Sequence, residues 1–106
     1  MPSEISPAEL RDRLTTATPP LVLDVREPKE IALARFDGAL AIPMGDVPAR
    51  VEDLPRDREI VVLCHHGVRS AQVASFLVHH GLDRVVNLRG GIDAWSLQVD
   101  PGVPRY

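Results

Sequence analysis

The sequence is poor in several residue types that mark specialised classes of protein. Its 106 residues include one cysteine, one tryptophan, one tyrosine and one lysine. Cys64 cannot form a disulfide within the chain, so it is a packing residue, a metal ligand or a reactive thiol. The longest apolar run, Ile60 to Cys64, is far shorter than the roughly 20 residues that span a membrane. Because Met1 to Ser6 do not resemble a signal peptide, we expect a cytoplasmic location.

An excess of positive charge is also missing. Twelve basic residues stand against fifteen acidic ones, which gives a net charge of −3. Proteins that bind nucleic acid usually carry a basic excess or a basic stripe, so we expect no nucleic acid partner and no membrane partner. The hydrophobic share of 44% and the charged share of 25% are ordinary for a globular protein. At this length we expect a single domain over residues 1–106.

Strand-like and helix-like patterns alternate along the chain. We expect strands over residues 21–25, 39–42, 60–63 and 85–88, and helices over residues 6–15, 28–34, 46–54, 70–80 and 92–99. The strand Ile60 to Leu63 is apolar at every position, as a strand covered on both faces must be. Ser70 is the expected N-cap of the helix that follows, and Gly81 is expected just after its end. The alternation predicts an α/β fold with a mainly parallel central sheet and helices on both faces.

The segment from Cys64 to Arg69 joins that buried strand to a helix and is the most informative part of the sequence. The backbone N–H groups of such a turn can point inward to bind an anion, and the helix N-terminus adds positive potential. Together with the charge of Arg69, these donors favour the thiolate of Cys64, while Gly67 permits a positive φ. The segment therefore predicts a nucleophilic thiol in an anion-binding loop. A buried, inert cysteine is the alternative.

Four motifs resemble those of the rhodanese-like sulfurtransferases, in the same order along the chain. They are Leu23-Asp24-Val25-Arg26-Glu27-Pro28, Asp37-Gly38-Ala39-Leu40-Ala41-Ile42-Pro43, Cys64-His65-His66-Gly67-Val68-Arg69-Ser70 and Leu88-Arg89-Gly90-Gly91-Ile92-Asp93-Ala94-Trp95. The resemblance implies a rhodanese-like domain in which Cys64 is catalytic. Cys64 would take a sulfane sulfur from a donor such as thiosulfate as a persulfide and pass it to cyanide, a thiol or a sulfur-carrier protein.

The resemblance also implies roles for other residues. Those expected to bind the substrate or its anionic group are His65, His66, Gly67, Val68, Arg69 and Ser70. Asp24 and Arg26 are expected to support the loop, and an ion pair between them or with a nearby glutamate is their simpler role. The resemblance implies that no cofactor is required. No metal is expected either, because three consecutive residues such as Cys64, His65 and His66 cannot converge on one tetrahedral ion.

The segment 98–106 resembles the end of rhodanese modules fused behind molybdopterin-synthase-type adenylyltransferases. This similarity implies a ubiquitin-like sulfur-carrier protein and its adenylyltransferase as partners, in addition to small-molecule donors and acceptors. A general sulfurtransferase without a dedicated carrier is the simpler alternative.

Two other functions fit parts of the pattern. A non-enzymatic persulfide relay or interaction module would carry the same cysteine. A cysteine phosphatase or arsenate reductase would use a similar loop, but those enzymes typically have five residues between cysteine and arginine. Here four residues separate Cys64 from Arg69, and the smaller loop favours a sulfane sulfur over a tetrahedral oxyanion.

Overall fold

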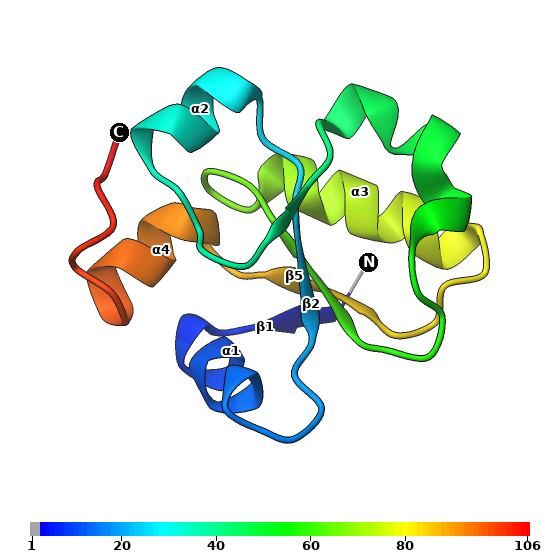
Figure 1. Cartoon of the computed structure of the whole chain (residues 1–106), viewed down its shortest axis with the longest axis horizontal. Coiled ribbons are helices and arrows are strands. Elements are labelled where there is room, and N and C mark those ends of the chain that lie inside the picture. The colour runs from blue at the N-terminus through cyan, green and yellow to red at the C-terminus, as the bar shows by residue number, and fades with distance from the viewer. Residues whose placement is uncertain (1–2) are drawn as a thin grey trace.

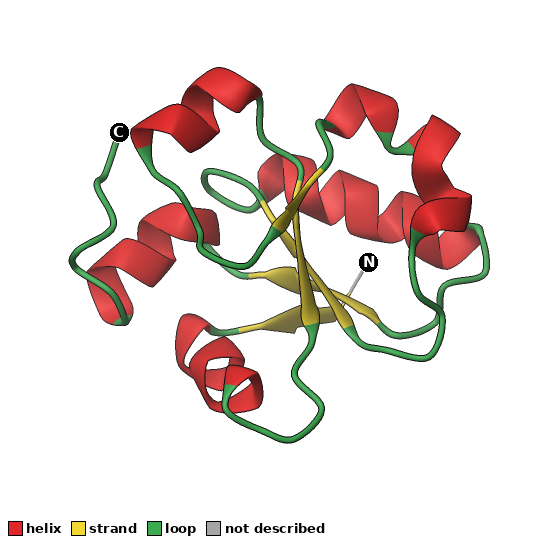
Figure 2. Cartoon of the chain, viewed as in Figure 1, coloured by secondary structure: helices red, strands yellow, loops and turns green. Residues whose placement is uncertain are grey.

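A five-stranded sheet forms the centre of the fold, which the computed structural model of the chain describes over residues 3–106. Its strands are β1 (Ser3–Ile5), β2 (Leu21–Asp24), β3 (Leu40–Ala41), β4 (Ile60–Leu63) and β5 (Val85–Leu88). They lie in the order β1-β5-β4-β2-β3, and every neighbouring pair is parallel (Figures 1 and 2). The predicted parallel sheet is confirmed.

Helices cover both faces of this sheet, as predicted. They are α1 (Pro7–Leu14), α2 (Pro28–Leu33), α3 (Val68–His79), α4 (Gly91–Gln98) and the short 3-10 helices η1 (Met44–Asp46) and η2 (Pro48–Asp53). Successive side chains of a strand point to opposite faces. Val62 of β4 accordingly packs in one core cluster with Leu77 of α3, while Val61 packs in a second cluster with Leu10 of α1 and Trp95 of α4.

The structure corrects three expectations about the elements. The edge strand β1 was not predicted, because three residues are too few to show a pattern and its pairing with β5 is a long-range contact. Residues 46–54 do not form an α-helix: the 3-10 helix η1 ends at Asp46, and Pro48, whose fixed φ suits a first helical turn, begins the 3-10 helix η2. Helix α3 begins at Val68 with Gly67 as its N-cap, so Ser70 is not the cap but lies inside the helix.

The carboxyl ends of the parallel strands meet at one edge of the sheet, where ligands bind in folds of this kind. Asp24 ends β2, Cys64 follows β4, and Arg89 follows β5. Hydrogen bonds tie these ends together: the Val25 N–H donates to the Leu63 carbonyl at 3.0 Å. The fold thus brings two of the four sequence motifs directly beside the cysteine. None of the helices within residues 3–106 is long and apolar enough to cross a bilayer.

Candidate active site

The thiol of Cys64 lies buried between the end of β4 and the start of α3. Only 1% of the residue is exposed. Its Sγ accepts a hydrogen bond from the Gly67 N–H at 3.0 Å and lies 3.2 Å from the Ser70 hydroxyl. Gly67 has φ +99°, a left-handed conformation that residues with a side chain rarely adopt. This turn directs the Gly67 N–H back to the sulfur, so both donors suit a negatively charged Sγ.

Helix α4 fixes the first half of the loop from the other side. The N–H groups of Ile92 and Asp93 donate to the carbonyls of Cys64 and His65 at 2.9 and 3.1 Å. A side chain at Gly91 would overlap those carbonyl oxygens, so the glycine permits this close approach. In a trans peptide the C=O and N–H groups point in opposite directions. The loop N–H groups that follow these two carbonyls therefore point away from α4.

A buried polar chain supports both donors to the sulfur. Asn87 of β5, which is fully buried, donates to the Gly67 carbonyl at 3.1 Å and accepts from the Ser70 hydroxyl at 2.5 Å. Its amide also donates to Glu4 at 3.1 Å. Because the Ser70 hydroxyl has one proton, it donates either to Asn87 or to Sγ at a given moment. Asn87 thereby holds the two groups that contact the sulfur, although it lies outside the Cys64–Arg69 loop.

Arg69, at the end of the loop, is paired with Glu30 of α2. Two hydrogen bonds of 2.7 and 2.8 Å join the guanidinium to the two carboxylate oxygens. Chiefly through the Arg69 hydrogen bonds, the pKa of Glu30 falls to about 2, and the same pair raises the pKa of Arg69. Arg69 therefore has its charge balanced by Glu30, and an anionic ligand would have to share it or displace the carboxylate.

Asp24 and Arg26 form a buried ion pair beside the loop. Arg26 is fully buried, and its Nε and Nη2 donate to the two oxygens of Asp24 at 2.9 and 2.7 Å. Removal of one partner from such a pair typically costs about 3–5 kcal/mol, because the other charge stays buried and unpaired. Neither residue contacts Sγ by a hydrogen bond within residues 3–106. Their position suits the supporting role that the sequence indicates.

Comparison with known proteins identifies the family to which the chain belongs. The family model described as Rhodanese-like domain matches residues 6–98. The chain belongs to the rhodanese-like family. The predicted resemblance is confirmed, and with it the assignment of the α/β fold.

Rhodanese-like relatives and structures extend the match over nearly the whole chain. A sulfurtransferase of Allochromatium vinosum is 42% identical over 91% of this chain and 90% of its own length. The adenylyltransferase/sulfurtransferase MoeZ of Mycobacterium tuberculosis is 38% identical over 98% of this chain, which spans only 27% of that protein. A rhodanese-related protein of Thermoplasma volcanium has 33% identity and a TM-score of 0.85, with 98% of this chain and 99% of that one covered. These relatives support sulfur transfer as the general activity.

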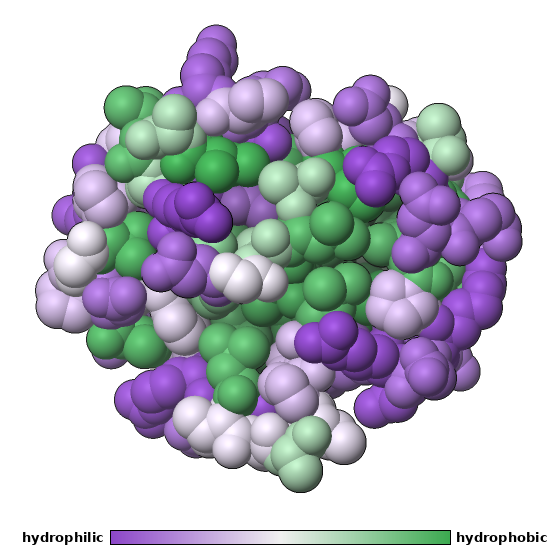
Figure 3. Space-filling model, viewed as in Figure 1, coloured by the Kyte–Doolittle hydropathy of each residue, from purple (hydrophilic) through white to green (hydrophobic). Residues whose placement is uncertain are grey.

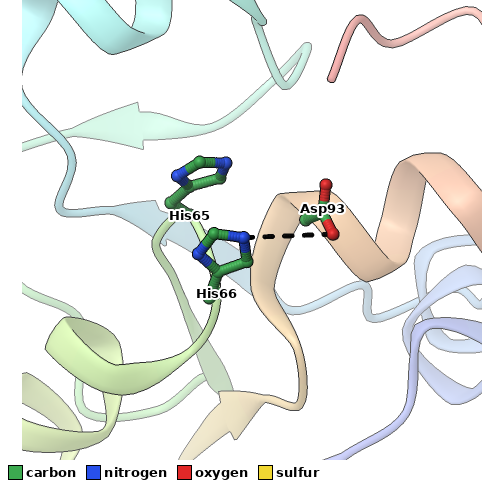
Figure 4. A group of neighbouring side chains, drawn as sticks. All are labelled: His65, His66 and Asp93. Carbon is green, nitrogen blue, oxygen red and sulfur yellow. Dashed lines mark ion pairs between the residues drawn. The ribbon is translucent and has the colours of Figure 1, made fainter. Parts of the chain in front are cut away.

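Two histidines and an aspartate gather at the outer side of the rhodanese-like loop. One ligand atom each of His65, His66 and Asp93 lies within 4.8 Å of the others (Figure 4). The two imidazole rings are stacked with centroids 3.8 Å apart, and both oxygens of Asp93 accept hydrogen bonds from Arg105. A metal ion held by all three would compete with Arg105 for the carboxylate. We assign no metal to the reaction.

The exposed part of the loop consists of His66 and Val68, the latter with 68% of its surface accessible. A nearby apolar hollow lies between the 3-10 helices and α3 and is lined by Met44, Val73 and Phe76, among others. These three residues belong to, or pack against, the core cluster that contains Cys64, so the hollow lies on the same face of the sheet. Figure 3 shows apolar side chains gathered in the middle of one side of the molecule, with polar ones around them.

The Cys64–Arg69 loop can be recognised from the sequence, but most of its partners cannot. The sequence indicates a nearby glutamate as a partner of Asp24 and Arg26 but not Glu30 as a partner of Arg69, and it indicates Asn87 only as part of a strand. Asp93 lies in a recognisable motif, but nothing in the sequence indicates its contact with the loop. A polar residue inside an otherwise apolar strand, such as Asn87 in Val85–Leu88, is the one signal that could have revealed a partner.

Proposed function

We propose that the protein is a sulfurtransferase that carries a sulfane sulfur on Cys64 as a persulfide. The observation that carries the proposal is the placement of Sγ between the Gly67 N–H and the Ser70 hydroxyl, at the carboxyl end of β4. Donors already in place stabilise a sulfur anion without reorganisation during the reaction. We expect Cys64 to be the catalytic residue and no cofactor to be required.

In the first half-reaction the Cys64 thiolate attacks the outer sulfur of thiosulfate. A sulfur–sulfur bond forms to Sγ, the sulfur–sulfur bond within thiosulfate breaks, and sulfite leaves with the electron pair. The Gly67 N–H and the Ser70 hydroxyl contact Sγ of Cys64, which carries the negative charge before the attack. The product is a persulfide on Cys64.

Arg69 is the expected contact for the anionic end of the donor. Its pairing with Glu30 reduces the net positive charge that a donor meets, so the donor has to draw the guanidinium away from that carboxylate. A neutral donor, such as an alkyl persulfide protonated at its terminal sulfur, needs no such contact. The proposal therefore includes a role for Arg69 that depends on the charge of the donor. His66 and Val68, the exposed residues of the loop, are proposed to contact the donor or the acceptor.

In the second half-reaction a nucleophile attacks the terminal sulfur of the persulfide and the Cys64 thiolate leaves. Cyanide or a thiol can act as this acceptor. With a sulfur-carrier protein activated as an acyl-adenylate the roles are reversed: the terminal sulfur of the persulfide attacks the carbonyl carbon and AMP leaves. Two equivalents of a thiol then reduce the acyl disulfide, which yields the thiocarboxylate, the Cys64 thiol and a disulfide of the two added thiols. The similarity to MoeZ, which is named as both an adenylyltransferase and a sulfurtransferase, favours a carrier protein that an adenylyltransferase activates. Because the thiol must return to its reduced form in each cycle, we propose a reducing compartment, the cytoplasm.

The length of the loop weighs against a phosphatase or arsenate reductase. Only four residues separate Cys64 from Arg69, and Arg69 faces Glu30 rather than an open cradle. The shorter loop leaves less room for a tetrahedral oxyanion than for a sulfane sulfur.

Steady-state sulfur transfer tests the proposal and separates its acceptors. Purified protein is supplied with thiosulfate and, in turn, with cyanide, glutathione or a ubiquitin-like carrier with its adenylyltransferase, with Cys64→Ser as the control. We expect turnover that depends on Cys64 with at least one acceptor. Transfer to the carrier alone would favour the relay function, and transfer to small molecules alone would exclude the dedicated carrier. Hydrolysis of a phosphate ester without any sulfur transfer would contradict the proposal.

A further inference from the structure

The segment after α4 folds back onto the active-site loop. Two contacts hold it against α4: the Ser96 hydroxyl of α4 donates to the Val103 carbonyl at 2.6 Å, and Arg105 pairs with Asp93 of α4 at 2.8 Å. Figure 1 shows the end of the segment, in red, beside α2.

Tyr106 makes the contacts that join this segment to the site. Its ring stacks on the imidazole of His65, with centroids 3.8 Å apart and an interplanar angle of 9°. Its hydroxyl donates to Glu30 at 2.8 Å and accepts from Arg26 at 3.2 Å. Because His66 stacks on His65 at the same centroid distance, the His65 ring lies between two aromatic rings. The Nε2 of His65 is buried and has no hydrogen-bond partner within residues 3–106.

These contacts reach both ends of the loop that holds the thiol. His65 directly follows Cys64, and Glu30 holds Arg69 by two hydrogen bonds. One side chain therefore contacts the first half of the loop and, through Glu30, its last residue. At the same time Cys64 is only 1% exposed. A thiol covered to this extent offers little surface to a donor sulfur, and movement of the groups around the loop would increase that surface.

We propose that Tyr106 is a positioning residue that holds the Cys64 loop in its covered form, through His65 at one end and the Glu30–Arg69 pair at the other. This role rests on the proposed function, since it concerns how a sulfur donor reaches Sγ. A stacked ring and two hydrogen bonds are contacts that break and re-form on the timescale of loop motion. Release of Tyr106 would free His65 to move and leave Glu30 with Arg69 as its remaining side-chain partner.

Alkylation of Cys64 measures access to the thiol without any sulfur donor. The rate constant with iodoacetamide is compared for the wild type, Tyr106→Ala and Tyr106→Phe. His80→Ala serves as a matched control, because His80 also stacks on an aromatic ring, Phe76, with centroids 4.0 Å apart. If the covered form predominates, we expect Tyr106→Ala to react about ten-fold faster and Tyr106→Phe, which keeps the ring, about two- to three-fold faster. His80→Ala should react at the wild-type rate.

A second readout separates positioning from general loosening of the fold. Burial, followed by the neighbouring His66, lowers the pKa of His65, while the carboxylates of Asp93 and Glu30 act in the opposite direction. Without the Tyr106 ring we expect the pKa of His65, followed by nuclear magnetic resonance, to rise toward its ordinary value. Tyr106→Phe restores the stack and should keep the pKa low.

Unchanged alkylation rates in a folded Tyr106→Ala protein would overturn the proposal. Should that variant fail to fold, Tyr106→Phe decides, and a wild-type rate for it would have the same meaning. Failure of the proposed function is visible separately: the wild type would then accept no sulfur from any donor, whatever the Tyr106 variants do to alkylation.

Discussion

Replacement of Glu30 by glutamine removes the charge that faces Arg69 but keeps a side chain of nearly the same shape. In the structure this carboxylate accepts both hydrogen bonds from Arg69 and one from Tyr106. If an anionic donor has to compete with Glu30 for the guanidinium, Glu30→Gln should improve the binding of thiosulfate. We expect a KM for thiosulfate about three- to ten-fold lower. The corresponding gain in binding free energy is a part of what one charge-assisted hydrogen bond contributes.

The same substitution should lower stability. A pKa lowered from 4.5 to about 2 corresponds to roughly 3 kcal/mol of preference for the ionised form. The Arg69 side chain is 35% exposed, so water screens the pair, and we expect the variant to lose about 1–2 kcal/mol. Since the folded-state pKa is depressed, the contribution is complete above pH ~4.5 and is lost as the pH falls toward 2. Near pH 2 the wild type and the variant should therefore approach equal stability.

The assay pairs thiosulfate:cyanide kinetics with urea denaturation at pH 7 and at acidic pH. Glu52→Gln is the matched control, because that glutamate is exposed and its oxygen lies 4.0 Å from Arg56. An unchanged or higher KM in Glu30→Gln, in a protein destabilised as expected, would refute the idea that Glu30 competes with the donor for Arg69.

The other predictions concern the supports of the loop. Arg69→Ala should reduce turnover with thiosulfate about ten- to hundred-fold, and more than turnover with a neutral persulfide; equal losses would leave Arg69 a purely structural role. Asn87→Leu should cost about 2–4 kcal/mol in urea denaturation and slow persulfide formation, since it leaves buried polar groups without partners. Gly91→Ala should destabilise by at least about 2 kcal/mol, while Gly45→Ala, which meets open space, should change little.

Much of the fold follows from local patterns in the sequence. The strand Ile60–Leu63 is apolar throughout, and helix α3 carries apolar residues at helical spacing, so both were predicted nearly at their observed bounds. The start of α3 was misjudged because Ser70 has the chemistry of an N-cap, whereas the left-handed turn at Gly67 sets the first residue of the helix. Strand β1 has three residues and depends on pairing with β5, which no local pattern can reveal.

The candidate site, too, is predictable from local sequence only where its residues are consecutive. The Cys64–Arg69 loop is a continuous motif and could be recognised from its residues. Its partners come from distant parts of the chain: Glu30 is 39 residues from Arg69, and Tyr106 is 76 residues from Glu30. A single sequence contains no record of such pairs. The expectation that Arg69 is available to bind an anion therefore took no account of a carboxylate that only the fold brings beside it.

The mass of the intact protein after incubation with thiosulfate tests the central claim most directly. The account predicts that the wild type gains the mass of one sulfur atom and loses it again when cyanide is added. Cys64→Ser should gain nothing under the same conditions. A wild-type protein that is folded, with a free thiol, and that takes up no sulfur from thiosulfate or any other sulfane donor would contradict the account.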